Sequence, residues 1–172
     1  MAKPVVEIHD YDTSWTDQFE REKQRVEGTL GHQALAIEHI GSTSVTGMPA
    51  KPIIDIMAGV SDLENALSFV KPLREIDYEY VQNSSFKDRF FFRKGLWRQG
   101  TCHLHICEYD GYEWRDKLLF RDYLRTNPKA AAEYASLKQQ LAAKYTYERS
   151  TYTKEKEPFI KRILMKARLE IE

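Results

Sequence analysis

Apolar positions early in the chain follow the spacing of an amphipathic helix. From residue 15 to residue 30 they recur every three or four positions. One stripe holds Trp15, Phe19, Glu22, Val26 and Leu30. The charged residues between them would lie in solvent, and Thr13 or Ser14 is expected to cap the helix.

The centre of the chain changes to the spacing of strands. Residues 34–40 and 53–60 form two short, mostly apolar runs, whereas residues 89–93 and 102–107 alternate along the chain. The spacing within residues 61–64 is that of a capping box, so a helix is expected from there to about residue 73.

Beyond Gly111 the spacing returns to that of helices. The first of these helices is expected around residues 114–124. A second should start at Asn127-Pro128 and run to about residue 144, because proline is favoured in the first turn of a helix. A third is expected over roughly residues 155–169.

The length of 172 residues suits one domain, and a hydrophobic content of 42% is enough to fill its core. A strand-rich core, at about 34–110, precedes a helical part, at about 112–172. This order predicts an α+β fold in a single domain spanning residues 1–172.

Charge and composition exclude several classes of protein. Lys plus Arg and Asp plus Glu both number 26, which disfavours a nucleic-acid partner. No apolar run approaches the roughly 18 residues of a membrane span, and the N-terminus lacks the apolar stretch of a signal peptide. Cys102 and Cys107 are too few for a disulfide framework. We therefore expect a cytoplasmic protein with no membrane partner.

Asp55 interrupts an otherwise apolar strand. Burying a bare carboxylate is prohibitive, so Asp55 must be solvated, paired or bound to a metal ion. A salt bridge to Lys51 or to an arginine is the structural explanation. We favour a catalytic role, because a charge within a central strand seldom serves packing alone.

Two further motifs could act with Asp55. In the turn Gly41-Ser42-Thr43-Ser44, hydroxyl and N–H groups could face a phosphate at a helix N-terminus, although such a turn is more often only a cap. His103 and His105 share one face of a strand and could bind one metal ion or donate to a phosphate. Their structural explanation is hydrogen bonding to neighbouring carboxylates.

Several cations could neutralise a bound phosphate. Arg89 and Arg93 share a strand face and could clamp one group, with Lys51 and Lys156 adding charge. A solvated or ion-paired face is the commoner explanation of such residues. Trp97 could cover a base or could simply pack.

Motifs along nearly the whole chain resemble the signature of the GrpB-like family. The resemblance rests first on residues 37–45 (Ile-Glu-His-Ile-Gly-Ser-Thr-Ser-Val) and 51–56 (Lys-Pro-Ile-Ile-Asp-Ile). Residues 103–106, 119–125, 134–138 and 152–156 match as well, in the right order. The resemblance implies a nucleotidyltransferase-like fold, with a mixed sheet, flanking helices and a helical C-terminal third.

In nucleotidyltransferases a Gly-Ser turn is followed by a strand that carries two carboxylates at i and i+2, which hold divalent metal for attack on a nucleotide phosphate. Gly41 and Ser42 match the turn, Asp55 matches the first carboxylate, and Met57 occupies the second position. Histidine would replace the third carboxylate. The ligand types then suit a single Mn²⁺ or Zn²⁺ better than two Mg²⁺, and they also suit a metal-free phosphate site.

The resemblance therefore implies a divergent protein that binds a nucleotide or phosphorylated small molecule and transfers a nucleotidyl or phosphoryl group. Asp55 would be the catalytic residue, and a divalent metal (Mn, Zn or Mg) would lie on Asp55, His103 and His105. Phosphate would contact Gly41, Ser42, Thr43, Ser44, Lys51, Arg89, Arg93 and Lys156. The alternative, consistent with Met57, is a catalytically degenerate module that binds the same ligand without turnover.

Overall fold

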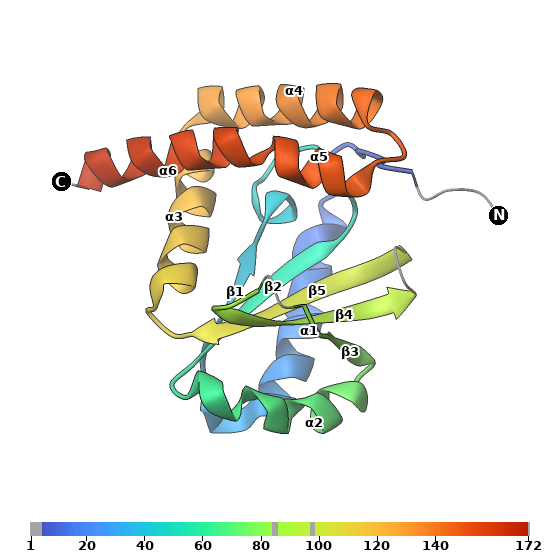
Figure 1. Ribbon diagram of the computed structural model, residues 1–172, viewed down its shortest axis with the longest axis vertical. Helices are drawn as coiled ribbons and strands as arrows, with labels where there is room; N and C mark the ends of the chain where they lie inside the picture. The colour runs from blue at the N-terminus through green and yellow to red at the C-terminus, as the bar shows by residue number, and fades with distance from the viewer. Residues whose placement is uncertain (1–4, 84–85, 97–98, 172) are drawn as a thin grey trace.

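Five strands form one mixed sheet in the computed structural model, which describes residues 5–83, 86–96 and 99–171 (Figure 1). The strands are β1 (Ala34–Ile40), β2 (Ile54–Val60), β3 (Tyr78–Val81), β4 (Arg89–Leu96) and β5 (Gln99–Glu108). Their order across the sheet is β1-β2-β5-β4-β3. β2 and β5 run parallel, and the other neighbours are antiparallel.

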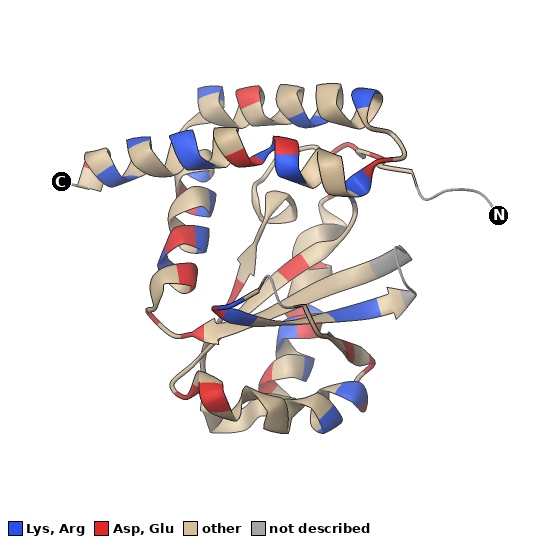
Figure 2. Cartoon of the chain, in the orientation of Figure 1, with Lys and Arg blue, Asp and Glu red and all other residues tan. Residues whose placement is uncertain are grey.

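Helices cover both faces of this sheet. The helices are α1 (Ser14–Leu30), α2 (Val70–Arg74), α3 (Tyr112–Thr126), α4 (Pro128–Lys144), α5 (Arg149–Glu155) and α6 (Glu157–Ile171). Figure 1 shows α1 and α2 on one side and the layer of α4, α5 and α6 on the other, with α3 connecting sheet to layer. Basic and acidic residues are interspersed along α3 and α4 (Figure 2), as the balanced composition suggests.

Side-chain alternation divides the sheet into an apolar face and a polar face. On the apolar face, Ile56, Leu104 and Phe92 are fully buried and join the main core with Val26 and Leu30 of α1. The intervening residues of β2 and β5 point to the other face, toward the C-terminal helices. This second face carries the residues with candidate chemistry.

The α+β architecture and most of the elements agree with the sequence predictions. β1 has the predicted bounds, β2 begins one residue later, and α1 buries the predicted apolar positions. The predicted final helix corresponds to α6 within two residues, whereas α5, which precedes it and ends just before Lys156, was not predicted. None of the helices in the described ranges is long and apolar enough to cross a membrane.

The predicted helix caps are wrong. Thr13 lies in the helical region and makes no side-chain cap bond, and Ser14 N donates instead to Asp12 Oδ1 at 2.8 Å. At the predicted capping box, a 3-10 helix (Leu63–Phe69) precedes the short α2, and Asp62 makes no side-chain cap bond. Local side-chain spacing predicted the position of these helix starts but not their hydrogen bonds.

Candidate functional site

The turn after β1 is built around Gly41 and Asp55. Gly41 has a φ of 74°, and a Cβ added to it would lie 2.6 Å from Asp55 Oδ2. Only glycine lets the backbone turn there and approach the carboxylate so closely. The next residues, Ser42–Ser44, form a 3-10 helix of three residues. No α-helix starts at this turn, so the expected helix N-terminus is that of a short 3-10 helix, and phosphate binding by the turn stays a prediction.

Asp55 lies directly between two histidines of the neighbouring strand. β2 and β5 pair in parallel with Asp55 opposite His103. Asp55 Oδ1 is 3.5 Å from His103 Nδ1 and 3.4 Å from His105 Nε2. All three side chains are on the polar face of the sheet, so the predicted juxtaposition of these residues is confirmed.

These contacts keep Asp55 ionised. Burial by itself would raise the pKa of Asp55, but hydrogen bonds from His103 and His105, together with their charge, hold that pKa well below its usual range. Burial lowers the pKa of His105, while Asp55 opposes the shift. An aspartate with so low a pKa is a poor general base, and its clearest task is to orient the imidazoles.

The polar face does not offer a ready set of metal ligands. Met57, at the position of a second carboxylate, is fully buried in an apolar cluster with Ile40, Cys107 and Trp114. Among the residues that the structure describes, no group of three or more His, Cys, Asp or Glu side chains is placed to hold a metal ion. Metal on Asp55, His103 and His105 therefore stays a prediction, and no step below depends on it.

A small cavity of about 100 Å³ lies beside Asp55 and His103. Ser42 and Thr43 of the turn line it together with three lysines from separate parts of the chain, Lys51, Lys138 and Lys156. Lys51 precedes β2, Lys138 is on α4, and Lys156 joins α5 to α6. We call them the cavity lysines.

Aromatic rings and one carbonyl hold the cavity lysines in place. The ammonium groups of Lys51 and Lys156 lie 5.2 Å and 4.7 Å from the centre of the Tyr152 ring. Lys138 Nζ donates to the Pro49 carbonyl oxygen and lies 4.8 Å from the Tyr134 ring. Cation–π contacts and a carbonyl acceptor steady these groups but leave their positive charge in place.

Asp55 lines the same cavity and offsets the charge of Lys51 and Lys156 only in part. Burial, followed by the charge of Lys156 and Arg149, lowers the pKa of Lys51 to about 7. Burial and the two other cavity lysines lower the pKa of Lys138 to about 7, and burial lowers that of Lys156 to about 8. Within the described ranges, no salt bridge joins a carboxylate to any cavity lysine. The cavity thus concentrates positive charge next to hydroxyl groups, as an anion site does.

The predicted arginine clamp lies away from the small cavity, and phosphate binding by these arginines stays a prediction. Arg89 and Arg93 lie on the polar face of the sheet as expected, but neither lines the cavity. Arg89 Nη1 donates to Glu113 Oε1 at 2.6 Å, and Arg93 Nη2 donates to Glu79 Oε2 at 3.3 Å. Both arginines of β4 therefore form ion pairs, one with α3 and one with β3. Trp97, considered as a cover for a base, lies outside the described residues.

Comparison with known proteins identifies the family. The family model described as GrpB protein matches residues 5–166. The chain belongs to the GrpB family. It is 37% identical over 166 residues to the Glutamate-rich protein GrpB of Alkalihalophilus pseudofirmus, covering 94% of this chain and 95% of that protein. It is also 38% identical over 159 residues to the UPF0157 protein YqkA of Bacillus subtilis, but there it spans only 46% of the relative's length.

Solved structures include a member of the same family and a more distant protein with a similar fold. The crystal structure of GrpB from Enterococcus faecalis matches with a TM-score of 0.86 and 37% identity, over 94% of this chain and 96% of that chain. The Cid1 poly(U) polymerase with magnesium and 3′-dATP bound matches with a TM-score of 0.54 and 12% identity. That match covers 79% of this chain and 43% of the polymerase. This GrpB-family chain therefore has a nucleotidyltransferase-like fold.

Two residues of the GrpB-family cavity, Lys138 and Tyr152, were missed as site residues in the sequence. Lys138 does carry a signal, because it lies four residues after Tyr134 and three before Leu141, on the buried stripe of α4. A lysine on an apolar stripe indicates that its ammonium group has an interaction within the fold. Tyr152 offered no such signal, since a buried tyrosine on a helix normally packs in a core.

Proposed function

We propose that this GrpB-family protein binds the phosphate groups of a nucleotide or another phosphorylated small molecule in the cavity beside Asp55. The observation that supports this most is the convergence of the three cavity lysines on a cavity whose lining includes one carboxylate, Asp55. Each ammonium is costly to keep charged there, and a phosphate would supply the missing negative charge. Ser42 and Thr43 would donate hydroxyl hydrogen bonds from the opposite wall.

The size of the cavity limits which part of the ligand enters it. At about 100 Å³ it is far smaller than the roughly 300–1,000 Å³ that encloses a whole drug-sized ligand. Only the phosphate end would enter the cavity, and the remainder of the ligand would lie outside. The protein would therefore recognise polyphosphate charge more strongly than the identity of the attached group.

If the bound molecule reacts, Asp55 and His103 supply the proton chemistry. A hydroxyl oxygen of an acceptor would attack phosphorus, its proton would pass to an imidazole oriented by Asp55, and the leaving phosphate would remain beside the cavity lysines. The distant fold similarity to the Cid1 polymerase supports transfer of this kind. Met57 favours the second candidate function, a module that binds phosphate without turnover, because the strand lacks a second carboxylate.

Binding can be tested with inorganic pyrophosphate, ATP and CTP by isothermal titration and thermal unfolding. Lys156→Met should weaken pyrophosphate binding at least tenfold, because it removes one of three converging charges. Lys154→Met is the matched control, since Lys154 is exposed on α5, two residues before Lys156, and lies outside the cavity. A ligand at about 100 times its dissociation constant should stabilise the parent by roughly 2.7 kcal/mol. Equal pyrophosphate affinity in both variants would contradict the proposal.

Turnover separates the two candidate functions. The protein would be incubated with a nucleoside triphosphate and hydroxyl acceptors, and released pyrophosphate would be followed. Release that requires the hydroxyl acceptor and is lost in Asp55→Asn and His103→Gln would establish a transferase. Tight binding with no release would establish the phosphate-binding module.

A further inference from the structure

A second and larger cavity, of about 860 Å³, opens on the other side of the turn that follows β1. Helices α1, α3 and α4, strand β1 and the segment from Ser44 to Pro49 enclose it. We call it the α1–α4 groove, and its main lining residues are Phe19, His39, Met48, Arg125, Ala131 and Ala132. It shares no lining residue with the phosphate cavity.

Small side chains keep the groove open. α4 presents Ala131, Ala132 and Ala135 to it, and Met48 and Leu124 complete an apolar wall. Larger side chains at the alanine positions would have closed the space against α1. The volume lies within the range of pockets that enclose small organic ligands.

The floor of the groove is aromatic and uncharged. His39 stacks on Phe19 of α1, with ring centres 4.6 Å apart and an angle of 12° between the rings. His39 Nε2 shares a hydrogen bond of 2.9 Å with Thr43 Oγ1. Burial lowers the pKa of His39 to about 4, so the imidazole is neutral at physiological pH. An apolar or aromatic ligand body would find a matching surface here.

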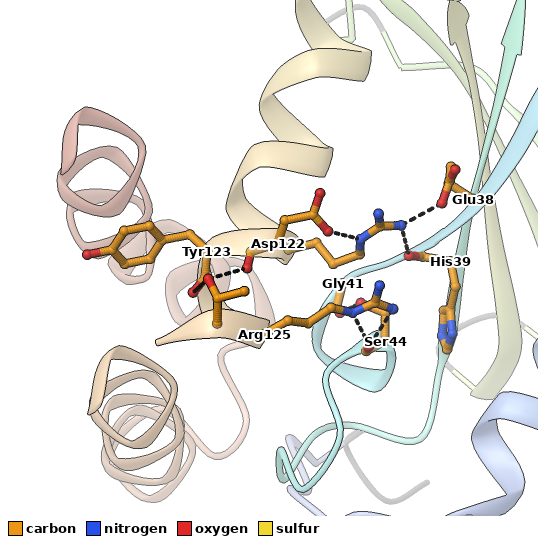
Figure 3. Close-up of polar contacts among 9 residues, drawn as sticks. Glu38, His39, Gly41, Ser44, Asp122, Tyr123 and Arg125 are labelled. Carbon is orange, nitrogen blue, oxygen red and sulfur yellow. Dashed lines mark hydrogen bonds and ion pairs between the residues drawn. The ribbon is translucent and has the colours of Figure 1, made fainter. Parts of the chain in front are cut away.

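The two arginines of the groove differ in how far they are neutralised. Arg121 Nη1 donates to Glu38 Oε2 at 2.6 Å, and Arg121 Nε donates to Asp122 Oδ1 at 2.9 Å. Arg125 instead donates from Nε and Nη2 to the Ser44 carbonyl oxygen, at 3.0 Å and 2.8 Å (Figure 3). Neither bond uses Arg125 Nη1, and no salt bridge of Arg125 occurs in the parts of the chain that the structure covers.

We infer that the α1–α4 groove binds a small organic anion with an apolar body, whose acidic group pairs with Arg125. Guanidinium groups bind carboxylates, sulfonates and phosphates with paired N–H donors. Among the described residues both hydrogen bonds of Arg125 go to a neutral carbonyl, while Asp122 and Glu38 act on it through their charge. The stacked His39 and Phe19 and the alanine wall of α4 would hold the body of the ligand. This site is separate from the phosphate cavity and does not depend on its function.

The test uses 8-anilinonaphthalene-1-sulfonate, which joins an aromatic body to one sulfonate and fluoresces when it leaves water. Ala132→Trp should weaken its binding at least tenfold by filling the groove. Ala143→Trp is the matched control, because Ala143 is exposed on the same helix and lies outside the groove. Circular dichroism would verify that both variants keep the parent fold.

A second comparison tests the role of charge. Arg125→Gln should weaken binding of the sulfonate at least fivefold and leave binding of its neutral analogue, N-phenyl-1-naphthylamine, unchanged. Lys156→Met should change neither. Equal sulfonate binding in Ala132→Trp and Ala143→Trp would refute the groove as the binding site. An equal effect of Arg125→Gln on both dyes would refute recognition of the acidic group by Arg125.

Discussion

Replacing Gly41 with alanine would place a methyl carbon 2.6 Å from Asp55 Oδ2 and 3.1 Å from Asp55 Cβ. Two costs follow. The first is backbone strain, because the φ of 74° at Gly41 is one that alanine rarely adopts, and such strain costs about 1–3 kcal/mol. The second is displacement of the Asp55 carboxylate from His103 and His105, which would leave buried polar groups unpaired at about 1–3 kcal/mol.

Gly47→Ala isolates the first cost. Gly47 has a φ of 83°, and a Cβ there would meet no atom within 4 Å. Gly47→Ala should therefore lower the free energy of unfolding by about 1–3 kcal/mol through strain alone. Gly41→Ala should lower it by roughly 2–6 kcal/mol. Urea unfolding with linear extrapolation measures both values.

Asp55→Ala completes a double-mutant cycle. It removes the carboxylate that the new methyl group would meet. Gly41→Ala should therefore destabilise the Asp55→Ala variant by at least about 1 kcal/mol less than it destabilises the parent. Equal destabilisation by Gly41→Ala and Gly47→Ala, or strict additivity with Asp55→Ala, would refute the close packing of Gly41 on the carboxylate.

Three shorter predictions concern charge. The cavity lysines have lowered pKa values, so the folded protein holds fewer protons than the unfolded chain, and the free energy of unfolding should rise from pH 7 to pH 10. Lys138→Met should flatten this profile, measured by urea unfolding. An unchanged slope would contradict the prediction. Met57→Asp should lower stability by about 2–4 kcal/mol by burying a carboxylate among apolar side chains. A larger recovery of Tm with Mn²⁺ in this variant than in the parent would support the metal prediction, and equal recovery would assign Met57 to packing alone. Arg89→Gln and Arg93→Gln should leave pyrophosphate affinity within twofold of the parent by titration, because both arginines pair with glutamates, and a tenfold loss would restore the clamp.

The strands of this fold could be predicted where one face is buried. β1 and β2 combine β-branched and apolar residues in short runs that end at glycine or serine, and their bounds were found to within one residue. β3 was not identified separately, because its four residues pair with β4 through long-range contacts that no local pattern records. The short α5 was not predicted, because its seven residues do not form a clear apolar stripe.

Some residues of the candidate site could likewise be predicted from local patterns, and others depend on tertiary packing. Asp55, His103 and His105 could be placed together because strand alternation and a charge in an apolar run are local signals. Lys51 and Lys156 were named for their charge, but their meeting with Lys138 depends on how α4 and α5 pack above the sheet. Arg89 and Arg93 pair with glutamates of α3 and β3 instead of lining the cavity, and composition offered no means of telling the two outcomes apart.

The cavity lysines also have a mechanical consequence. One of them belongs to the approach to β2, and the other two belong to the C-terminal helical layer. Without a bound anion, repulsion among the protonated lysines would weaken the packing of the helical layer on the sheet. A bound polyphosphate would form ion pairs with all three lysines and so connect the helical layer to the sheet. Binding of an anion in the cavity and the packing of the helical layer on the sheet would then be coupled.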